Sequence, residues 1–124
     1  MTGTDHFPIR IIGERINPGF RSSKALFDDS DLPGIQALAV KQAQAGARWL
    51  NVNIGARALT DTAFLTDVIQ AIQAVVTLPL SFDVPSVQAH ELCLRVYDPA
   101  RAGGARSVLN SITEHRWDAM GLYP

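Results

Sequence analysis

The sequence has little cysteine, almost no excess charge and no long apolar run, and each shortage excludes a class of protein. Its single cysteine, Cys93, allows no internal disulfide and no thiolate cage for zinc. Eleven Lys and Arg stand against twelve Asp and Glu, a formal charge of -1, so we expect no nucleic-acid partner. Apolar stretches are broken within a few residues by Gln, Asp, Arg or Pro, so no membrane span is expected.

The histidines, the cysteine and the N-terminus add further expectations. His6, His90 and His115 are far apart and show no metal-ligand spacing, so we predict no metal site. We expect His90 to be solvated on a helix surface, and Cys93 to be a small buried apolar residue. The first six residues lack both the basic segment and the apolar run of a signal peptide, which predicts a cytoplasmic protein.

The 124 residues, 47% hydrophobic and 19% charged, are typical of one compact domain spanning residues 1–124. Short β-branched runs alternate with longer stretches of helical period, the pattern of parallel βα units in an α/β fold. The segments expected as strands are Ile9–Ile12, Trp49–Ile54, Leu78–Asp83 and Ser107–Ser111. A loop rich in Pro, Gly, Ser and Asp is expected after the first strand.

Apolar residues at helical spacing predict helices between the strands. They are expected over about Leu32–Ala45, from a cap at Thr60 or Asp61 through Val76, and from about Ser86 to a stop ahead of Pro99. Asp31 and Gly46 flank the first helix as N-cap and terminating residue. The third helix is expected to bury Val87, Leu92 and Val96.

Polar residues fall at or just beyond the carboxyl ends of the expected strands. They are Glu14, Asn53, Asp83 and Asn110. Parallel α/β folds build their sites at this end of the sheet. Asn51 and Asn53 lie on one face of a strand, where an amide is unexpected unless something hydrogen-bonds it. Loop backbone could supply those bonds as well as a ligand could.

Four segments together resemble the pterin-binding family. They are Gly13–Asn17, Leu50–Gly55, Phe82–Asp83 and Leu109–Ile112. Within that family the chain is most similar to the methyltetrahydrofolate-dependent methyltransferases: the corrinoid protein methyltransferases and the folate domain of cobalamin-dependent methionine synthase. The similarity extends from about residue 10 onward, and the order of the four segments makes it more specific than any one of them.

The resemblance implies a set of site residues. The family aspartate of the third strand corresponds to Asp83, whose carboxylate can accept a forked pair of hydrogen bonds from the pterin ring N–H and amino group. The family asparagine of the fourth strand corresponds to Asn110, the expected catalytic residue, which stabilises the protonated pterin as the methyl group leaves. Glu14, Asn17 and Asn53 correspond to further substrate-binding positions. Glu14 could equally pair with Arg15 or Arg57.

The implied function is binding of methyltetrahydrofolate and transfer of its methyl group to a corrinoid (cobalamin) carried by a partner protein. The sequence offers no activated nucleophile of its own, which fits this chemistry. One alternative is a non-catalytic half-barrel that serves as a binding or assembly module. A weaker alternative is a dihydropteroate synthase-like enzyme. The run Gly-Glu-Arg-Ile-Asn disfavours it, because that enzyme has an Asn-x-Thr-Pro-Asp-Ser pattern there.

Two features depart from the family pattern. Asn51 stands where the family usually has Asp, and Val84–Pro85 replace two hydroxyl residues. The family folds as an eight-stranded (β/α) barrel of about 250 residues, so this chain is expected to be the N-terminal half, with four parallel βα units. A half-barrel needs a homodimer partner or a complementary half-barrel chain. A small open flavodoxin-like sheet is the alternative architecture.

Overall fold

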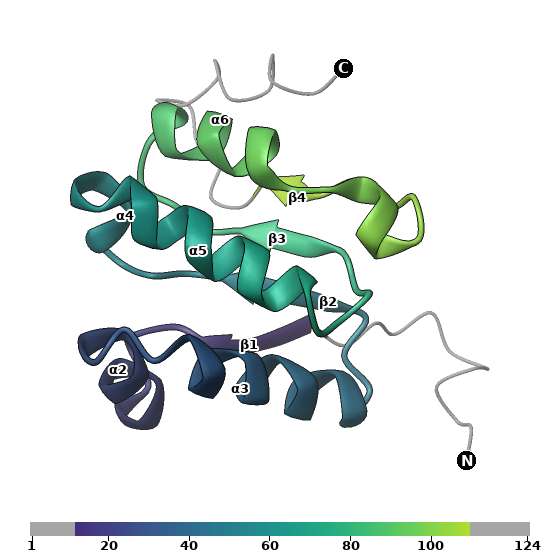
Figure 1. The fold of residues 1–124 in the computed structure, drawn as a ribbon, viewed down its shortest axis with the longest axis horizontal. Helices are drawn as coiled ribbons and strands as arrows, with labels where there is room; N and C mark the ends of the chain where they lie inside the picture. The colour runs from purple at the N-terminus through teal and green to yellow at the C-terminus, as the bar shows by residue number, and fades with distance from the viewer. Residues whose placement is uncertain (1–11, 110–124) are drawn as a thin grey trace.

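The computed structural model of the chain describes residues 12–109, which form an α/β fold (Figure 1). The strands are β1 (Ile12–Ile16), β2 (Trp49–Val52), β3 (Leu80–Phe82) and β4 (Val108–Leu109). The α-helices are α2 (Arg21–Asp28), α3 (Leu32–Gln44), α4 (Arg57–Thr60), α5 (Thr62–Gln73) and α6 (Val87–Val96), and a 3-10 helix η1 covers Pro99–Ala102. No helix in this part of the chain is long and apolar enough to cross a membrane.

The strands form one parallel sheet in the order β1-β2-β3-β4, the same as their order in the sequence. Helix α5 packs against both α3 and α6, so the three long helices form a single layer beside the sheet (Figure 1). A flavodoxin-like fold instead has the strand order 2-1-3-4-5 and helices on both faces. The described residues therefore do not have the flavodoxin-like topology that was the alternative expectation.

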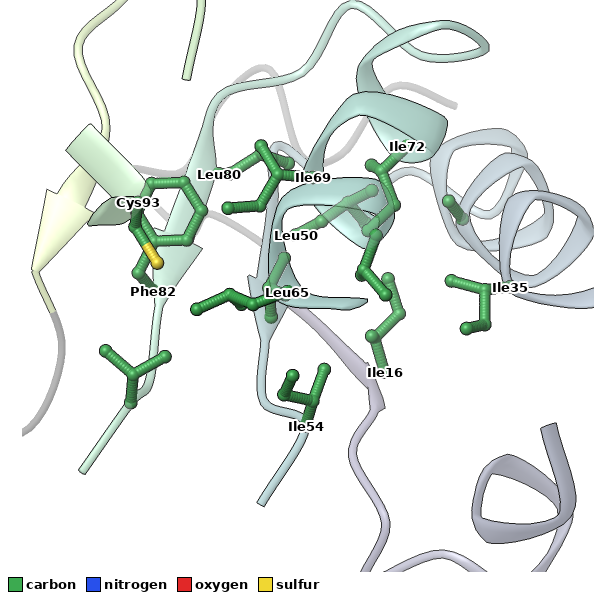
Figure 2. Packing of buried hydrophobic residues seen from close by; sticks show 14 of the residues in the cluster. Ile16, Ile35, Leu50, Ile54, Leu65, Ile69, Ile72, Leu80, Phe82 and Cys93 are labelled. Atoms are coloured by element: carbon green, nitrogen blue, oxygen red, sulfur yellow. The ribbon is translucent and has the colours of Figure 1, made fainter. Parts of the chain in front are cut away.

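The core lies between this sheet and its helix layer. Leu50 and Val52 on β2, and Leu80 and Phe82 on β3, are fully buried. Figure 2 shows the apolar side chains of α5 gathered over these strands. Leu65, Ile69 and Ile72 are among them, and all three are fully buried. The stripe that predicted this helix is thus its buried face, although Val75, beyond its last turn, is 41% exposed.

The predicted helix starts are confirmed by their side-chain caps. Asp31, Asp61 and Ser86 each accept a hydrogen bond from the backbone N–H three residues further along, at 2.9–3.0 Å. Such caps satisfy backbone donors that have no partner inside the helix. Gly46 follows the end of α3 with a φ of 103°, a left-handed conformation that glycine adopts without strain.

Two helices occupy segments where the sequence predicts none. Helix α2 lies in the polar stretch after the first strand, which is predicted as a loop, and α4 is a single turn. Neither has a side-chain N-cap, so the signal that marks the start of a helix is missing, and α2 buries only Ser23 and Phe27. Packing of Phe27 edge-to-face against Phe64, with ring centroids 6.5 Å apart, supplies tertiary support instead.

The first strand extends further along the sequence than predicted. It was expected at Ile9–Ile12, but the described strand is Ile12–Ile16, and residues 9–11 lie outside the described part of the chain. Glu14 is therefore inside β1 rather than beyond its end. The strand pairs with β2, and the register of this pairing shifts between Gly13 and Ile16. Gly13 and Ile16 are buried, whereas Glu14 and Arg15 between them are exposed.

Side chains from two helices hold this irregular strand in place. The backbone N–H of Arg15 donates to Gln42 Oε1 of α3 at 2.9 Å, and its carbonyl accepts a hydrogen bond from the Ser23 hydroxyl of α2. Gln42 is only 7% exposed, and its Nε2 has no acceptor among the described residues. Gly13 leaves the space that the Gln42 side chain occupies, because a Cβ on residue 13 would lie 2.5 Å from Gln42 Oε1. The shifted register thus depends on long-range contacts.

Helix α6 is rotated relative to the prediction. Val87, Leu92 and Val96 are only half-buried, whereas Ala89, His90 and Cys93 face the core. The expectation of a solvated His90 is wrong, because its ring finds a backbone carbonyl acceptor inside the core. Cys93 is buried as predicted, and its burial raises the pKa of the thiol to about 12.

Arg57 joins α4, α5 and the turn after α2. Its guanidinium donates to the Phe27 carbonyl at 2.7 Å and to the Asp61 carboxylate at 3.1 and 3.2 Å, and lies 3.5 Å from the centroid of the Phe64 ring. Arg57 therefore pairs with Asp61 and not with Glu14. The backbone N–H of Phe64 and the Arg57 guanidinium hold the pKa of Asp61 below its ordinary value of 3.8.

Replacing Gly13→Ala should destabilise the protein, because the added methyl group pushes Gln42 away from the Arg15 N–H. We expect a loss of about 1–3 kcal/mol in the free energy of unfolding, measured by urea denaturation. Gln42→Ala provides the control background, since it removes the side chain that the methyl group meets. If Gly13→Ala lowers the free energy of unfolding equally in the wild type and in the Gln42→Ala variant, the contact with Gln42 is not the cause of the destabilisation.

The contribution of Asp61 to stability should depend on pH. A carboxyl group with a lowered pKa stabilises the fold above its unfolded pKa, and that contribution is lost as the pH falls through the folded value. Asp61→Asn keeps a capping side chain but does not titrate. The stability difference between wild type and this variant should shrink as the pH falls from about 5 to about 2 in urea titrations. If the stability difference between wild type and Asp61→Asn does not change with pH, the ionised Asp61 carboxylate is not what stabilises the fold.

Candidate functional site

The polar residues that follow β2 and β3 meet at one edge of the sheet. Asn53 comes directly after β2, and its N–H donates to the Ile16 carbonyl of β1 at 3.0 Å. Asp83 comes directly after β3, and its N–H donates to the Val52 carbonyl at 3.0 Å. The ladder thus continues one residue beyond each strand. As a result Asn53 Nδ2 lies 3.4 Å from Asp83 Oδ2, at the outer limit of a hydrogen bond.

A tight turn fixes the orientation of the Asn53 amide. Its Oδ1 accepts a hydrogen bond from the Gly55 N–H at 2.8 Å, which leaves Nδ2 facing Asp83. Gly55 has a φ of +68°, and a Cβ on it would lie 3.1 Å from Pro18 Cγ in the loop after β1. Glycine is needed here both for the backbone conformation and for the approach of the neighbouring loop.

An open cleft of about 450 Å³ lies against this pair. Its lining residues are Asn53, Gly55, Ala56, Leu59, Asp83, Val84 and Pro85. The carboxylate of Asp83 is the one charge in a lining that is otherwise apolar apart from the Asn53 amide. Leu59, on α4, is 54% exposed and leaves a large apolar side chain at the rim. The cleft therefore combines a hydrogen-bonding pair with apolar walls, an arrangement typical of small-molecule sites.

The structure brings together two of the five predicted site residues, Asn53 and Asp83. Asn17 follows β1, but its Oδ1 accepts the Gly19 N–H at 2.8 Å, and it does not line the cleft. Glu14 is exposed within β1, has no ion pair among the described residues and does not line the cleft either. Asn110 lies outside the described residues.

Asn51, where the family usually has Asp, does not reach this cleft. It pairs in register with Ser81, and both residues are buried, at 3% and 5% exposed. Because successive strand residues point to opposite faces, Asn51 and Ser81 lie on the face turned away from Leu50, Val52 and the helix layer.

Sequence reasoning missed the apolar walls of the cleft. Leu59 and Ala56 come from the turn and short helix α4, which no sequence signal predicted. Val84 and Pro85 were noted only as departures from a family pattern, yet both line the cleft. The available signal was their position, because residues that follow a parallel strand lie at the site edge whatever their type.

No protein-family model matches the sequence. Across residues 12–109, no group of three or more His, Cys, Asp or Glu side chains is placed to hold a metal ion. The side chains of the described cleft offer a carboxylate acceptor, an amide donor beside it, and apolar walls.

Asn53→Asp should destabilise the protein in a pH-dependent way. The variant keeps an acceptor for the Gly55 N–H but places a second carboxylate beside Asp83. We expect a loss of about 1 kcal/mol at pH 7, most of which disappears at about pH 4 as one carboxylate takes up a proton. Urea titrations at both pH values measure this. Asn53→Ala is the control, because its loss should be the same at both pH values.

Proposed function

We propose that the chain is a pterin-binding domain of the methyltetrahydrofolate-dependent methyltransferase type. The observation that carries the proposal is the Asp83 carboxylate beside the Asn53 amide, in a cleft at the carboxyl end of a parallel sheet. The sequence resemblance assigned pterin contacts to both residues, and the fold brings them together from two strands. The substrate would be methyltetrahydrofolate, bound through its pterin.

The chemistry of the cleft supports a pterin ligand. The pyrimidine half of a pterin presents a ring N–H beside an exocyclic amino group, and the two oxygens of Asp83 can accept both. Leu59 and Pro85 supply apolar surface for the flat ring. In this proposal Asn110, which follows Leu109 in the sequence, is the catalytic group that stabilises the protonated pterin. Glu14 and Asn17 are assigned outer substrate contacts by the resemblance alone.

The methyl acceptor in this proposal is a corrinoid held by a partner protein, which supplies the cobalt nucleophile when bound there. The thiol of Cys93 is not a competing nucleophile, because it is buried with a pKa of about 12. The role of this chain is to orient and polarise the folate. We place the reaction in the cytoplasm, a reducing compartment that suits a chain whose single cysteine cannot form an internal disulfide.

We further propose that the fold is half of an eight-stranded (β/α) barrel. Sequential strand order and a single helix layer are the arrangement of a barrel wall. Among the described residues, β1 pairs only with β2 and β4 pairs only with β3. Ile12 and Val108, on these two outer strands, are 50% and 42% exposed. A second copy of the chain or a complementary half-barrel chain would pair both strands and cover these side chains.

The open outer strands also favour a second candidate, a half-barrel that binds or assembles without turnover of its own. Methyl transfer from methyltetrahydrofolate to free cob(I)alamin, followed by its absorbance, separates the two candidates. Turnover by the purified chain eliminates the second candidate. Folate binding without turnover favours it. Light scattering with and without the folate then tests whether binding strengthens a dimer.

Asp83→Ala should weaken binding of methyltetrahydrofolate at least about tenfold, because a charge-assisted hydrogen bond to the pterin is lost. Isothermal titration calorimetry measures the affinity. Asp67→Ala is the matched control, since it removes an exposed aspartate from α5, outside the cleft, and should leave the affinity unchanged. Equal affinities of wild type and Asp83→Ala would refute the proposed pterin site.

A further inference from the structure

The backbone immediately before Asp83 is held from two sides. Phe82 is the last residue of β3, and its carbonyl shares one planar peptide group with the N–H of Asp83. That N–H donates to Val52 of β2 at 3.0 Å. The carbonyl lies 3.2 Å from Nε2 of His90, which comes from α6. One peptide group is therefore fixed at its nitrogen by the sheet and at its oxygen by a helix side chain.

The geometry also fixes the proton on His90. A carbonyl oxygen has no hydrogen to give, so Nε2 must be the donor in this contact. His90 is 0% exposed, and its neighbours on the buried face of α6 are the small residues Ala89 and Cys93. Burying an imidazole costs free energy unless its polar atoms find partners. The Phe82 carbonyl is such a partner for Nε2, and it belongs to the residue directly before Asp83.

We propose that His90 is a positioning residue for the candidate site, which acts by orienting the Asp83 carboxylate through the Phe82–Asp83 peptide group. The direction of the Cα–Cβ bond of Asp83 follows from the plane of this peptide group and one backbone torsion. A tilt of the peptide moves the carboxylate relative to Asn53, whose amide is fixed by its own turn. At 3.4 Å the contact between Asn53 and Asp83 is already long, so a small tilt breaks it.

The alternative role for His90 is packing alone, and the shape of its replacements separates the two. His90→Leu fills similar space without a donor. His90→Gln places an amide N–H near the position of Nε2 and so can restore the hydrogen bond. Cys93→Ala is the packing control, because it alters the same buried face of α6 but leaves the hydrogen bond between His90 and the Phe82 carbonyl in place.

The first measurement needs no ligand. Amide hydrogen exchange by NMR reports how tightly the Asp83 N–H is held, and the Asn53 side-chain resonances report its contact with Asp83. In His90→Leu we expect exchange at Asp83 to rise about tenfold more than at Leu80 in the same strand, with shifted Asn53 side-chain signals. His90→Gln should reverse both changes, and Cys93→Ala should produce neither. Equal effects of His90→Leu and Cys93→Ala would reduce His90 to a packing residue.

The wild-type protein provides a test that does not depend on any variant folding. Long-range nitrogen–proton NMR of the imidazole identifies which ring nitrogen carries hydrogen. Hydrogen on Nε2 is required by the proposal. An unprotonated Nε2 would overturn it.

The second measurement rests on the proposed function. Calorimetric affinity for methyltetrahydrofolate should fall about fivefold to tenfold in His90→Leu and recover to within about twofold in His90→Gln. If the wild type binds no folate, the proposed pterin site fails, whereas the exchange and tautomer measurements still decide the role of His90. If the wild type binds folate and His90→Leu binds it equally well, the positioning role is wrong although the pterin site stands.

Discussion

Burial of one face of the sheet under one layer of helices is the constraint on which the rest of the structure depends. Leu50, Val52, Leu80 and Phe82 all enter this apolar layer. Because side chains alternate along a strand, their neighbours Asn51, Asn53, Ser81 and Asp83 are turned the other way. The parallel register then places the last residues of β2 and β3 side by side. The polar pair at the site is thus a geometric consequence of where the core lies.

The parts of the fold that could be predicted from the sequence rest on local chemistry. A carboxylate or hydroxyl three residues ahead of a free backbone N–H caps a helix in nearly any context, and Asp31, Asp61 and Ser86 do so here. The stripe on α5 likewise needs no knowledge of distant residues. The position of β1 was not predictable in this way, because it depends on Gln42 and Ser23 reaching Arg15 from two helices.

The same distinction applies to the candidate site. Asp83 and Asn53 could be predicted because both directly follow strands of strong apolar character. Leu59 could not, because α4 has no cap and no periodic stripe. His90 was misassigned to the surface because its burial depends on one carbonyl at the end of β3, which a sequence pattern does not reveal. The resemblance to pterin-binding proteins supplied the ligand hypothesis, which stays a prediction alongside the role of Asn110.

The register shift in the outer strand β1 affects which chains can pair with the sheet at high protein concentration. Long, flat outer strands recruit any passing chain into indiscriminate β-pairing and promote aggregation. Here β1 carries a register shift between Gly13 and Ile16 that interrupts its ladder. This outer strand of the described sheet is thus a poor template for a generic strand. A partner strand that adds to β1 along its length must match this irregular outline, so the irregularity selects among partners.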